Sequence, residues 1–323
     1  MNDNVSTATR TVPRDLVVVL LATFDGSLHL RQQLDSIASQ SHGHWRLIVA
    51  DDGSGDDTLG IVQAFSEEHP GRVRLVRGGA VRSARDNFFR LLRVADSAPY
   101  LAFCDQDDVW SVDKLERLVL RCQQIEAQFP SQPCLVYSDL AVVDARLGLI
   151  NPSFMEQIRA RPNDISYKSL LAENAIPGCA MLFNGALADV FRAREFDATK
   201  AIMHDWWVAL IASTLGRMSY VSTPLVQYRQ HSKNMLGSVD RSGLPFILSK
   251  LFRGNRRAVV RTYTQAATFL GAYSDLLDPT TRNELQTFAS LLHHNKVARV
   301  WLILKHRILK QTLSRRAYQL LRA

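Results

Sequence analysis

The stretch Tyr100-Leu101-Ala102-Phe103-Cys104-Asp105-Gln106-Asp107-Asp108 joins an apolar run to a cluster of carboxylates. The apolar residues 98–103 predict a short buried strand, so the acids lie where that strand ends. Three like charges within four positions repel one another and add nothing to a folded core. A hard divalent ion with oxygen ligands would offset that repulsion. The stretch therefore predicts a cation site at a strand end.

On both sides of this stretch, short apolar runs alternate with helical patterns from residue 16 to about residue 139. The expected strands are residues 16–21, 45–50, 73–76, 100–104 and 135–138. The expected helices are residues 28–39, 56–68, 84–94 and 113–128, the second capped by Asp56 or Asp57. This alternation predicts an α/β fold of β-α-β units, with a Rossmann-like, mostly parallel sheet flanked by helices.

Polar residues follow three of these strands. Thr23 and Asp25 follow the first strand, and Asp51 and Asp52 follow the second. Ligands of such sheets bind beyond the carboxyl ends of the strands. A carboxylate at residue 51 or 52 can accept hydrogen bonds from a pyrimidine or a ribose hydroxyl. The same residues are also compatible with an Asp-Gly turn closed by a local side-chain bond.

Asp105 and Asp107 form a D-x-D arrangement. Residues two apart on an extended segment point to one side, so both carboxylates can approach one Mg²⁺ or Mn²⁺ ion. That ion would also bind a substrate diphosphate. Asp108 has an alternative role as the cap of a helix that begins near Ser111 or Asp113.

Three further residues lie around the start of the third expected helix: Arg82, Arg85 and Asn87. Helix amino ends and arginine both suit phosphate. The competing interpretation is a solvated basic face, with Asn87 as a helix cap.

His204-Asp205-Trp206-Trp207 places a charged pair against two tryptophans. The rings can form the wall of a sugar pocket, and a carboxylate beside them has a raised pKa suited to a general base. The alternative is a buried helix start. His231 follows a strand-like stretch and is either a third metal ligand or a structural histidine.

The bulk composition is that of an ordinary globular protein, with 323 residues, 46% hydrophobic and 22% charged. The net charge of +8 favours an anionic partner. The four cysteines are scattered, with no C-x-x-C pair and no zinc spacing, which predicts reduced thiols in the cytoplasm. No segment has the length of a transmembrane helix. Residues 1–12 are expected to be a disordered tail.

Six blocks in this order and spacing resemble the inverting glycosyltransferases of family 2, which have the GT-A fold. The resemblance runs from about residue 16 to residue 234. The blocks are residues 17–25, 51–54, 104–110, 177–180, 204–207 and 229–231. Gln-Asp-Asp-Val-Trp and His-Asp-Trp-Trp further resemble bacterial rhamnosyltransferases of polysaccharide and O-antigen assembly.

The resemblance implies a role for each matching residue. Asp205 matches the catalytic base, although many relatives have Glu-Asp where this chain has His204-Asp205. Asp107 matches a direct metal ligand. The other implied roles are nucleotide-sugar binding by Thr23, Asp25, Asp51, Asp52, Arg82, Arg85, Asn87 and Asp105, metal or diphosphate binding by Asp105 and His231, and an acceptor or sugar pocket at Gly178, His204, Trp206 and Trp207.

The implied reaction is a single displacement that moves a sugar from a nucleotide-sugar donor to a hydroxyl of a lipid-linked polysaccharide. The resemblance favours dTDP-rhamnose, with UDP- and GDP-sugars as alternatives. A nucleotidyltransferase would need a Gly-rich phosphate loop that residues 23–27 lack. The basic residues also lack the aromatic interleaving of a nucleic-acid platform, which argues against a nucleic-acid partner.

Residues 296–323 contain eight Lys or Arg residues and no acids, with apolar residues near helical spacing. Such a helix suits the surface of an anionic membrane. The alternative is a helix docked on the catalytic domain. The expected organisation is a GT-A domain at residues 13–237 and a helical region at residues 238–323. The expected location is the cytoplasm, at the inner face of the cytoplasmic membrane.

Overall fold

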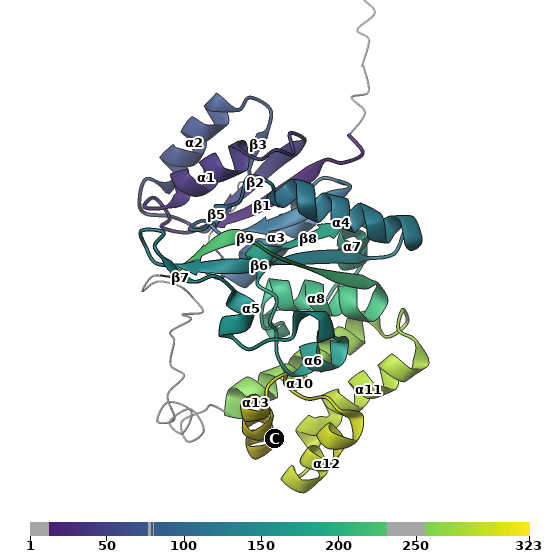
Figure 1. Ribbon diagram of the computed structural model, residues 1–323. Helices are drawn as coiled ribbons and strands as arrows, with labels where there is room; N and C mark the ends of the chain where they lie inside the picture. Colours follow the sequence, from purple (N-terminus) through teal and green to yellow (C-terminus); the bar gives the residue numbers. More distant parts are fainter. Residues whose placement is uncertain (1–12, 77–78, 80, 231–255) are drawn as a thin grey trace, which may run out of the picture.

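A curled central sheet with helices on both faces forms the body of the molecule, and a group of C-terminal helices lies beside it (Figure 1). The computed structural model describes residues 13–76, 79, 81–230 and 256–323. The predicted α/β class with a C-terminal helical extension is confirmed. His231 and the expected boundary near residue 237 lie outside the described residues.

The N-terminal half of the sheet is parallel, in the order β3-β2-β1-β4. Its strands are β1 (Val17–Thr23), β2 (Trp45–Asp51), β3 (Val73–Val76) and β4 (Tyr100–Cys104). Its connecting helices are α1 (Leu30–Ala38), α2 (Thr58–Glu68) and α3 (Ala84–Val94). The bounds of β3, β4 and α3 coincide with the expected ranges. α2 begins two residues later than expected, since the Asp56 carboxylate accepts the N–H of Thr58 (3.1 Å).

The second half of the sheet is mixed. β8 (Met181–Asn184) pairs antiparallel with β4 and with β6 (Cys134–Val143). β9 (Arg217–Arg229) runs parallel to β6, while β5 (Val109–Trp110) and β7 (Leu149–Asn151) add antiparallel edges. β6 extends five residues past its expected end because its pairing with β9 continues to Val143 and Arg229. The short β5 was not predicted.

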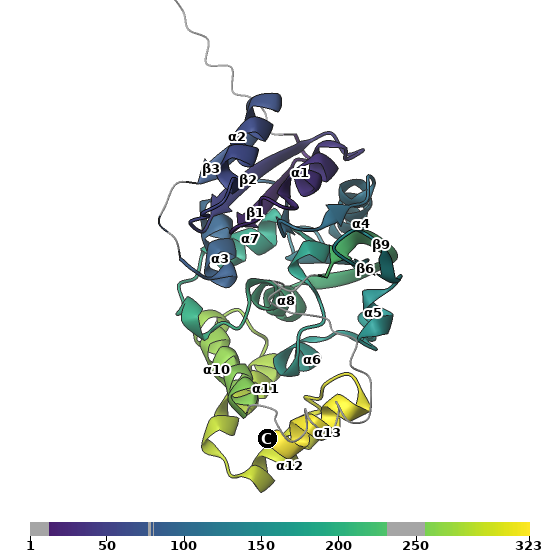
Figure 2. The ribbon, with the colours of Figure 1, turned by 90° about the vertical axis from the view of Figure 1, so that its left-hand side faces the viewer.

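The remaining helices fill the layers and the C-terminal end. They are α4 (Lys114–Gln128), α5 (Phe154–Gln157), α6 (Tyr167–Ala172), α7 (Gly185–Arg192), α8 (His204–Leu215), α10 (Arg256–Tyr273), α11 (Pro279–Ser290), α12 (Lys296–His306) and α13 (Leu313–Arg322). The short 3-10 turns are η1 (Pro162–Asp164), η2 (Gly178–Ala180), η3 (Ala198–Lys200) and η4 (Leu291–His293). In both views the C-terminal helices lie on the side of α6 and α8, and α10 packs against α6 (Figures 1 and 2).

Alternate residues of β1 enter different cores, which is why the strand is apolar throughout. Val17 and Val19 pack with α1, α2 and α4, whereas Val18 and Leu20 pack with α3, α7 and α8. The second of these cores continues into the C-terminal helices through Phe269 on α10. Each such side chain contributes about 1.5–3 kcal/mol by its burial. The C-terminal helices therefore share a core with the central sheet.

All four cysteines are buried and free. Among the described residues, every helix is too short or too polar to cross a bilayer.

Candidate active site

The carboxyl ends of β1, β2 and β4 meet at one edge of the sheet. Thr23 is opposite Asp51 in the β1–β2 register, and Leu21 is opposite Cys104 in the β1–β4 register. The Thr23 hydroxyl donates to Asp51 Oδ1 (2.9 Å). The strand ends that the sequence singled out are therefore neighbours in space.

Asp51 organises the loop after β2. It accepts the backbone N–H groups of Gly53 (3.0 Å) and Ser54 (2.9 Å) and the Ser54 hydroxyl. Partial burial raises the pKa of Asp51, but the hydrogen bonds from Ser54, Thr23 and Gly53 outweigh it and hold that pKa below its usual value. Asp25, whose φ of 45° is left-handed, accepts the N–H of Gly55 (2.8 Å). The two predicted nucleotide-binding loops are thus tied together.

Asp52 holds the loop that precedes α3. Its buried carboxylate accepts the backbone N–H groups of Val81 (2.5 Å), Arg82 (2.8 Å) and Ser83 (2.9 Å). Both oxygens have partners within the protein, and Arg82 takes a left-handed φ of 53° to supply one of them. Asp52 therefore shapes this side of the site through the backbone of residues 81–83.

Asn87 and Arg85 bind the protein itself. Asn87 is buried and donates to the carbonyl of Ala50 (2.7 Å). Arg85 pairs with Asp86 (2.8 Å) and donates to the carbonyl of Ala201 (2.8 Å). The cap role considered for Asn87 is wrong, since Ser83 is the N-cap of α3 and accepts the N–H of Asp86 (3.3 Å).

The loop after β4 is locked to the loop after β1. Gln106 and Phe24 exchange two hydrogen bonds, side chain to backbone, each of 2.8 Å. A Cβ atom at Gly26 would overlap the Gln106 carboxamide, so a side chain at this position would displace Gln106 from its contact with Phe24. This contact fixes the residue between Asp105 and Asp107.

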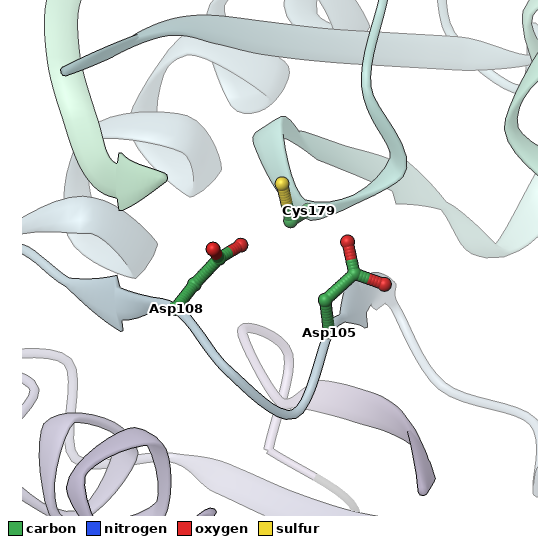
Figure 3. A group of neighbouring side chains, drawn as sticks. All are labelled: Asp105, Asp108 and Cys179. Carbon is green, nitrogen blue, oxygen red and sulfur yellow. The ribbon is translucent and has the colours of Figure 1, made fainter. Parts of the chain in front are cut away.

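Asp105, Asp108 and Cys179 form a compact cluster, with ligand atoms within 4.8 Å of one another (Figure 3). Asp108 Oδ1 accepts the N–H of Arg229 (3.1 Å), whereas Oδ2 has no hydrogen-bond partner in the described chain. Burial, then the charges of Asp107 and Asp205, raises the pKa of Asp105 to about 7. The sequence grouped Asp105 with Asp107, whereas the structure groups Asp105 with Asp108 and Cys179.

Asp108 does not cap α4, contrary to the alternative considered for it. The N-cap of α4 is Asp113, and Asp108 lies directly before β5. Its pKa is raised well above the usual range by burial, then by the charges of Asp107 and Asp105. Asp108 is therefore part of the acidic cluster.

Two buried cations that sequence reasoning missed lie beside these acids. Lys114 Nζ donates to the carbonyl of Cys179 (2.6 Å) and lies 3.3 Å from the ring centre of Trp110. Burial lowers the pKa of Lys114 to about 8, although the nearby acids oppose this effect. Arg229 donates to the backbone carbonyl of Asp107 (2.7 Å). Both cations offset the cluster's negative charge and fix its backbone.

Asp205 lies in the first turn of α8 and is only 7% exposed. It accepts the N–H of Trp206 (2.6 Å), and polar contacts with Gly178 and Asn174 also favour its ionised form. Burial outweighs these contacts and raises the pKa of Asp205 to about 6. A carboxylate with a pKa near neutrality is well matched to proton abstraction. Its charge also contributes to the raised pKa of Asp105, so the two acids are close.

His204 occupies a closed apolar slot. Its ring stacks on Phe88 (3.9 Å between centroids) and meets Phe103 edge-on (4.7 Å). Both ring nitrogens lack hydrogen-bond partners within the described residues, and burial lowers the pKa of His204 to about 3. A Cβ atom at Gly178 would approach Nε2 to 2.8 Å, so glycine makes room for the ring. His204 is therefore neutral.

The two tryptophans have different surroundings. Trp207 is fully buried and stacks on Phe196 (4.2 Å between centroids), next to Phe269 and Tyr273. Trp206 is half-buried, donates to the carbonyl of Leu170 and lines a cavity. Only Trp206 is placed to contact a ligand, because Trp207 belongs to the core.

The family model described as "Glycosyl transferase family 2" matches residues 18–191, more than half of the chain. This chain belongs to glycosyl transferase family 2. It is a glycosyltransferase, and the membership of family 2 that its motifs predicted is confirmed. The match covers the strand ends and the acidic cluster, while Asp205 lies beyond it.

Two curated relatives illustrate what this chain is similar to. It is 25% identical over 226 residues to the "dTDP-rhamnosyl transferase RfbG" of Shigella flexneri, covering 68% of this chain and 74% of that protein. It is 27% identical over 164 residues to the "UDP-Glc:alpha-D-GlcNAc-diphosphoundecaprenol beta-1,3-glucosyltransferase WfgD" of Escherichia coli, covering 51% and 58%.

Solved glycosyltransferases share its fold. S. aureus TarS in complex with UDP-GlcNAc superimposes with a TM-score of 0.56 at 14% identity, over 90% of this chain and 80% of TarS. The mannosyltransferase PcManGT from Pyrobaculum calidifontis, in complex with GDP-Man and Mn²⁺, gives 0.50 at 17% identity, over 90% and 72%. At such identities the likeness establishes the fold alone.

Proposed function

We propose that this glycosyltransferase is an inverting enzyme that uses Asp205 as its base. The observation that carries the proposal is a buried carboxylate with a pKa raised to about 6, close to the acidic strand end at Asp105. Asp205 accepts the proton of an acceptor hydroxyl as that oxygen attacks the anomeric carbon. The bond from this carbon to the diphosphate breaks, the nucleoside diphosphate leaves, and Asp205 returns the proton to solvent. No covalent enzyme intermediate forms.

The donor is a nucleotide-sugar that lies across the ends of β1, β2 and β4. Thr23, Asp25, Asp51 and the loop held by Asp52 would border the nucleoside, since their backbones are already fixed by hydrogen bonds. The names of RfbG and WfgD and the UDP-GlcNAc in TarS support a nucleotide-sugar. We favour dTDP-rhamnose because the RfbG match is the longer one; a UDP- or GDP-sugar is the alternative.

A divalent metal fits the acidic strand end. Asp105 and Asp107, the D-x-D pair, are the proposed oxygen ligands for Mg²⁺ or Mn²⁺. In the described cluster Asp105 lies with Asp108, whose buried Oδ2 lacks a hydrogen-bond partner in the described chain. His231, from the sequence prediction, is the proposed third ligand. Burial and the nearby carboxylates raise the pKa of the Cys179 thiol well above its usual value, so Cys179 is a poor ligand for such an ion. When bound, the metal would offset charge on the leaving diphosphate.

The acceptor is a hydroxyl of a lipid-linked glycan, and the C-terminal helices would place the enzyme at the membrane. Val297, Trp301 and Leu304 lie one turn apart along α12 and are 79%, 57% and 48% exposed. Basic residues flank this apolar stripe, and Lys305 lies over the Trp301 ring (4.6 Å). The opposite face of α12 is docked, since Ile303 is buried. We therefore propose peripheral binding to the anionic inner face of the cytoplasmic membrane.

A thermal-shift screen of nucleotide-sugars with and without Mn²⁺ or Mg²⁺ tests the proposal. A ligand that binds the native state raises the melting temperature according to its affinity. We expect a dTDP-sugar to stabilise more than UDP- or GDP-sugars, and only with metal. Stabilisation by a UDP- or GDP-sugar alone would assign that class of donor in place of dTDP-rhamnose. Absence of any shift with all three classes would contradict the proposed function.

A further inference from the structure

A cavity of about 250 Å³ lies between α8 and the C-terminal helices. Trp206 from α8 and Asn174 from the loop after α6 line one side of it. The C-terminal helices supply the other side through Arg261 and Tyr263 on α10, Lys310 before α13 and Tyr318 on α13. Within the described part of the chain, the residues predicted to bind the donor or the metal lie outside this lining.

We propose that this cavity binds one phosphate-bearing sugar unit of the acceptor, so that the C-terminal helices complete the acceptor site. The inference rests on the proposed function and extends it to a chemical class of ligand. The volume is slightly below the roughly 300–1,000 Å³ typical of ligand pockets, which suits one sugar ring better than an oligosaccharide.

The cavity opens close to the proposed base. Asn174 lines the cavity, and its side chain also lowers the pKa of Asp205, so it lies near that carboxylate. Trp206 follows Asp205 directly in α8 and lines the cavity as well. A sugar bound here would therefore lie one side chain away from the carboxylate that accepts the proton.

Aromatic rings and an unused hydroxyl suit a sugar. Trp206, Tyr263 and Tyr318 contribute rings to the lining, and such rings combine an apolar face with a polar edge. The Tyr263 side chain is 1% exposed, and its hydroxyl has no hydrogen-bond partner within the described chain. A buried hydroxyl left without a partner costs about 1–3 kcal/mol. A hydroxyl group of a bound sugar would remove that cost.

The charge balance of the lining favours an anion. Lys310 is paired with Glu173 (3.8 Å), which also pairs with Arg315 (3.4 Å). Arg261 is exposed at the cavity and forms no ion pair with any described residue. A guanidinium group with unused donors matches the oxygens of a phosphate ester. A lipid-linked acceptor carries a sugar-phosphate, which supplies a hydroxyl group for Tyr263 and a phosphate for Arg261.

Ligand-observed NMR with hexose 1-phosphates tests this inference on the full-length protein. The probes are the 1-phosphates of glucose, galactose, rhamnose and N-acetylglucosamine, and inorganic phosphate is the anion control. A saturating nucleoside diphosphate blocks the donor site during the titrations. We expect wild type to bind at least one hexose 1-phosphate more tightly than inorganic phosphate.

Two variants and two matched controls locate the binding. Arg261→Glu should weaken binding by about tenfold or more, because it reverses the charge that meets the phosphate. Tyr263→Phe should weaken it by about fivefold through the loss of one hydrogen bond. Arg257→Glu on the same helix and Tyr273→Phe, whose hydroxyl is bonded by Trp207 (3.3 Å), should change it by less than about twofold. Neither control residue lines the cavity.

Three results would overturn the inference: no hexose 1-phosphate bound by wild type, inorganic phosphate bound equally well, or equal losses in the controls. Hydrolysis of a nucleotide-sugar by wild type without acceptor reports the proposed function separately. Hydrolysis without any sugar-phosphate binding would defeat the cavity assignment alone. Binding without any turnover of nucleotide-sugars would defeat the proposed function alone.

Discussion

The proposed donor side and the proposed acceptor side of this glycosyltransferase are built differently. At the ends of β1 and β2, carboxylates such as Asp51 and Asp52 are saturated with hydrogen bonds, mostly from backbone N–H groups. Around α8 and α10, His204 and Tyr263 have buried polar atoms without hydrogen-bond partners in the described chain, and apolar packing holds them. The nucleotide part of a donor is common to many transfer reactions, so a rigid site suits it. On the proposed acceptor side, Tyr263 lines the cavity with its hydroxyl unpaired by any described residue, whereas His204 is enclosed by Phe88 and Phe103.

The largest effect is expected at Asp205, where a substitution should slow sugar transfer without weakening donor binding. Asp205→Asn should lower the transfer rate by about 10²–10⁴-fold, the usual contribution of a general base, while donor affinity stays near that of wild type. The amide keeps the size of the side chain but cannot accept the proton. Transfer kinetics and donor calorimetry check the two halves of this prediction. Transfer at the wild-type rate would refute the base assignment.

The pH profile of wild type supplies a control for this variant. The pKa of Asp205 is about 6, so the base is ionised above that pH and protonated below it. Transfer per donor-bound enzyme should therefore fall as the pH drops through about 6, and Asp205→Asn should lack this step.

The next effect concerns the two tryptophans of α8. Trp207→Ala should lower the free energy of unfolding by about 3–5 kcal/mol, because the ring fills the shared core. Trp206→Ala should cost clearly less, because its ring is half-buried. Urea denaturation of both variants measures the difference. Equal losses of stability would mean that Trp206 is also a core residue and would weaken its role at the cavity.

On the donor side, Asp107→Ala should weaken donor binding in the presence of Mn²⁺ or Mg²⁺ by about tenfold or more. Removing a metal ligand should weaken metal binding at least as much as removing a residue that orients such a ligand. With a chelator present, wild type and variant should bind equally. Asp113→Ala, at the half-buried N-cap position of α4, is the matched control. Calorimetry that shows unchanged affinity with metal would count against Asp107 as a ligand.

The smallest effect is expected at the membrane. Trp301→Ser should weaken binding to anionic liposomes by a few fold, because an exposed ring no longer enters the interface. Added salt should weaken wild-type binding as well. Leu149→Ser changes an equally exposed apolar residue on β7 and serves as control. Cosedimentation that is insensitive to both Trp301→Ser and salt would favour helices that only dock on the protein.

The N-terminal half of the molecule was predicted closely from the sequence, because the signals that define its elements are local. β3, α3 and β4 match their expected bounds because apolar periodicity and end signals operate within a few residues. Asp105 was singled out because acids that follow an apolar strand are unusual. These signals do not depend on the rest of the fold.

What the sequence did not predict depends on distant partners. The length of β6 follows from its pairing with β9, and the place of Asp108 in the cluster follows from the N–H of Arg229, 121 positions away. Lys114 has the sequence context of any residue in the first turn of an amphipathic helix, and only tertiary packing buries it against Trp110. The cavity joins α8 to helices more than fifty residues later, so no local pattern could indicate it.

The stereochemistry of the product tests the central claim most directly. A single displacement in which Asp205 deprotonates the acceptor oxygen inverts the anomeric carbon. NMR of the glycoside formed by wild type from the donor selected in the thermal-shift screen should show the anomeric configuration opposite to that of the donor. Retention of the donor's configuration would contradict a single displacement with one base, and with it the proposed role of Asp205.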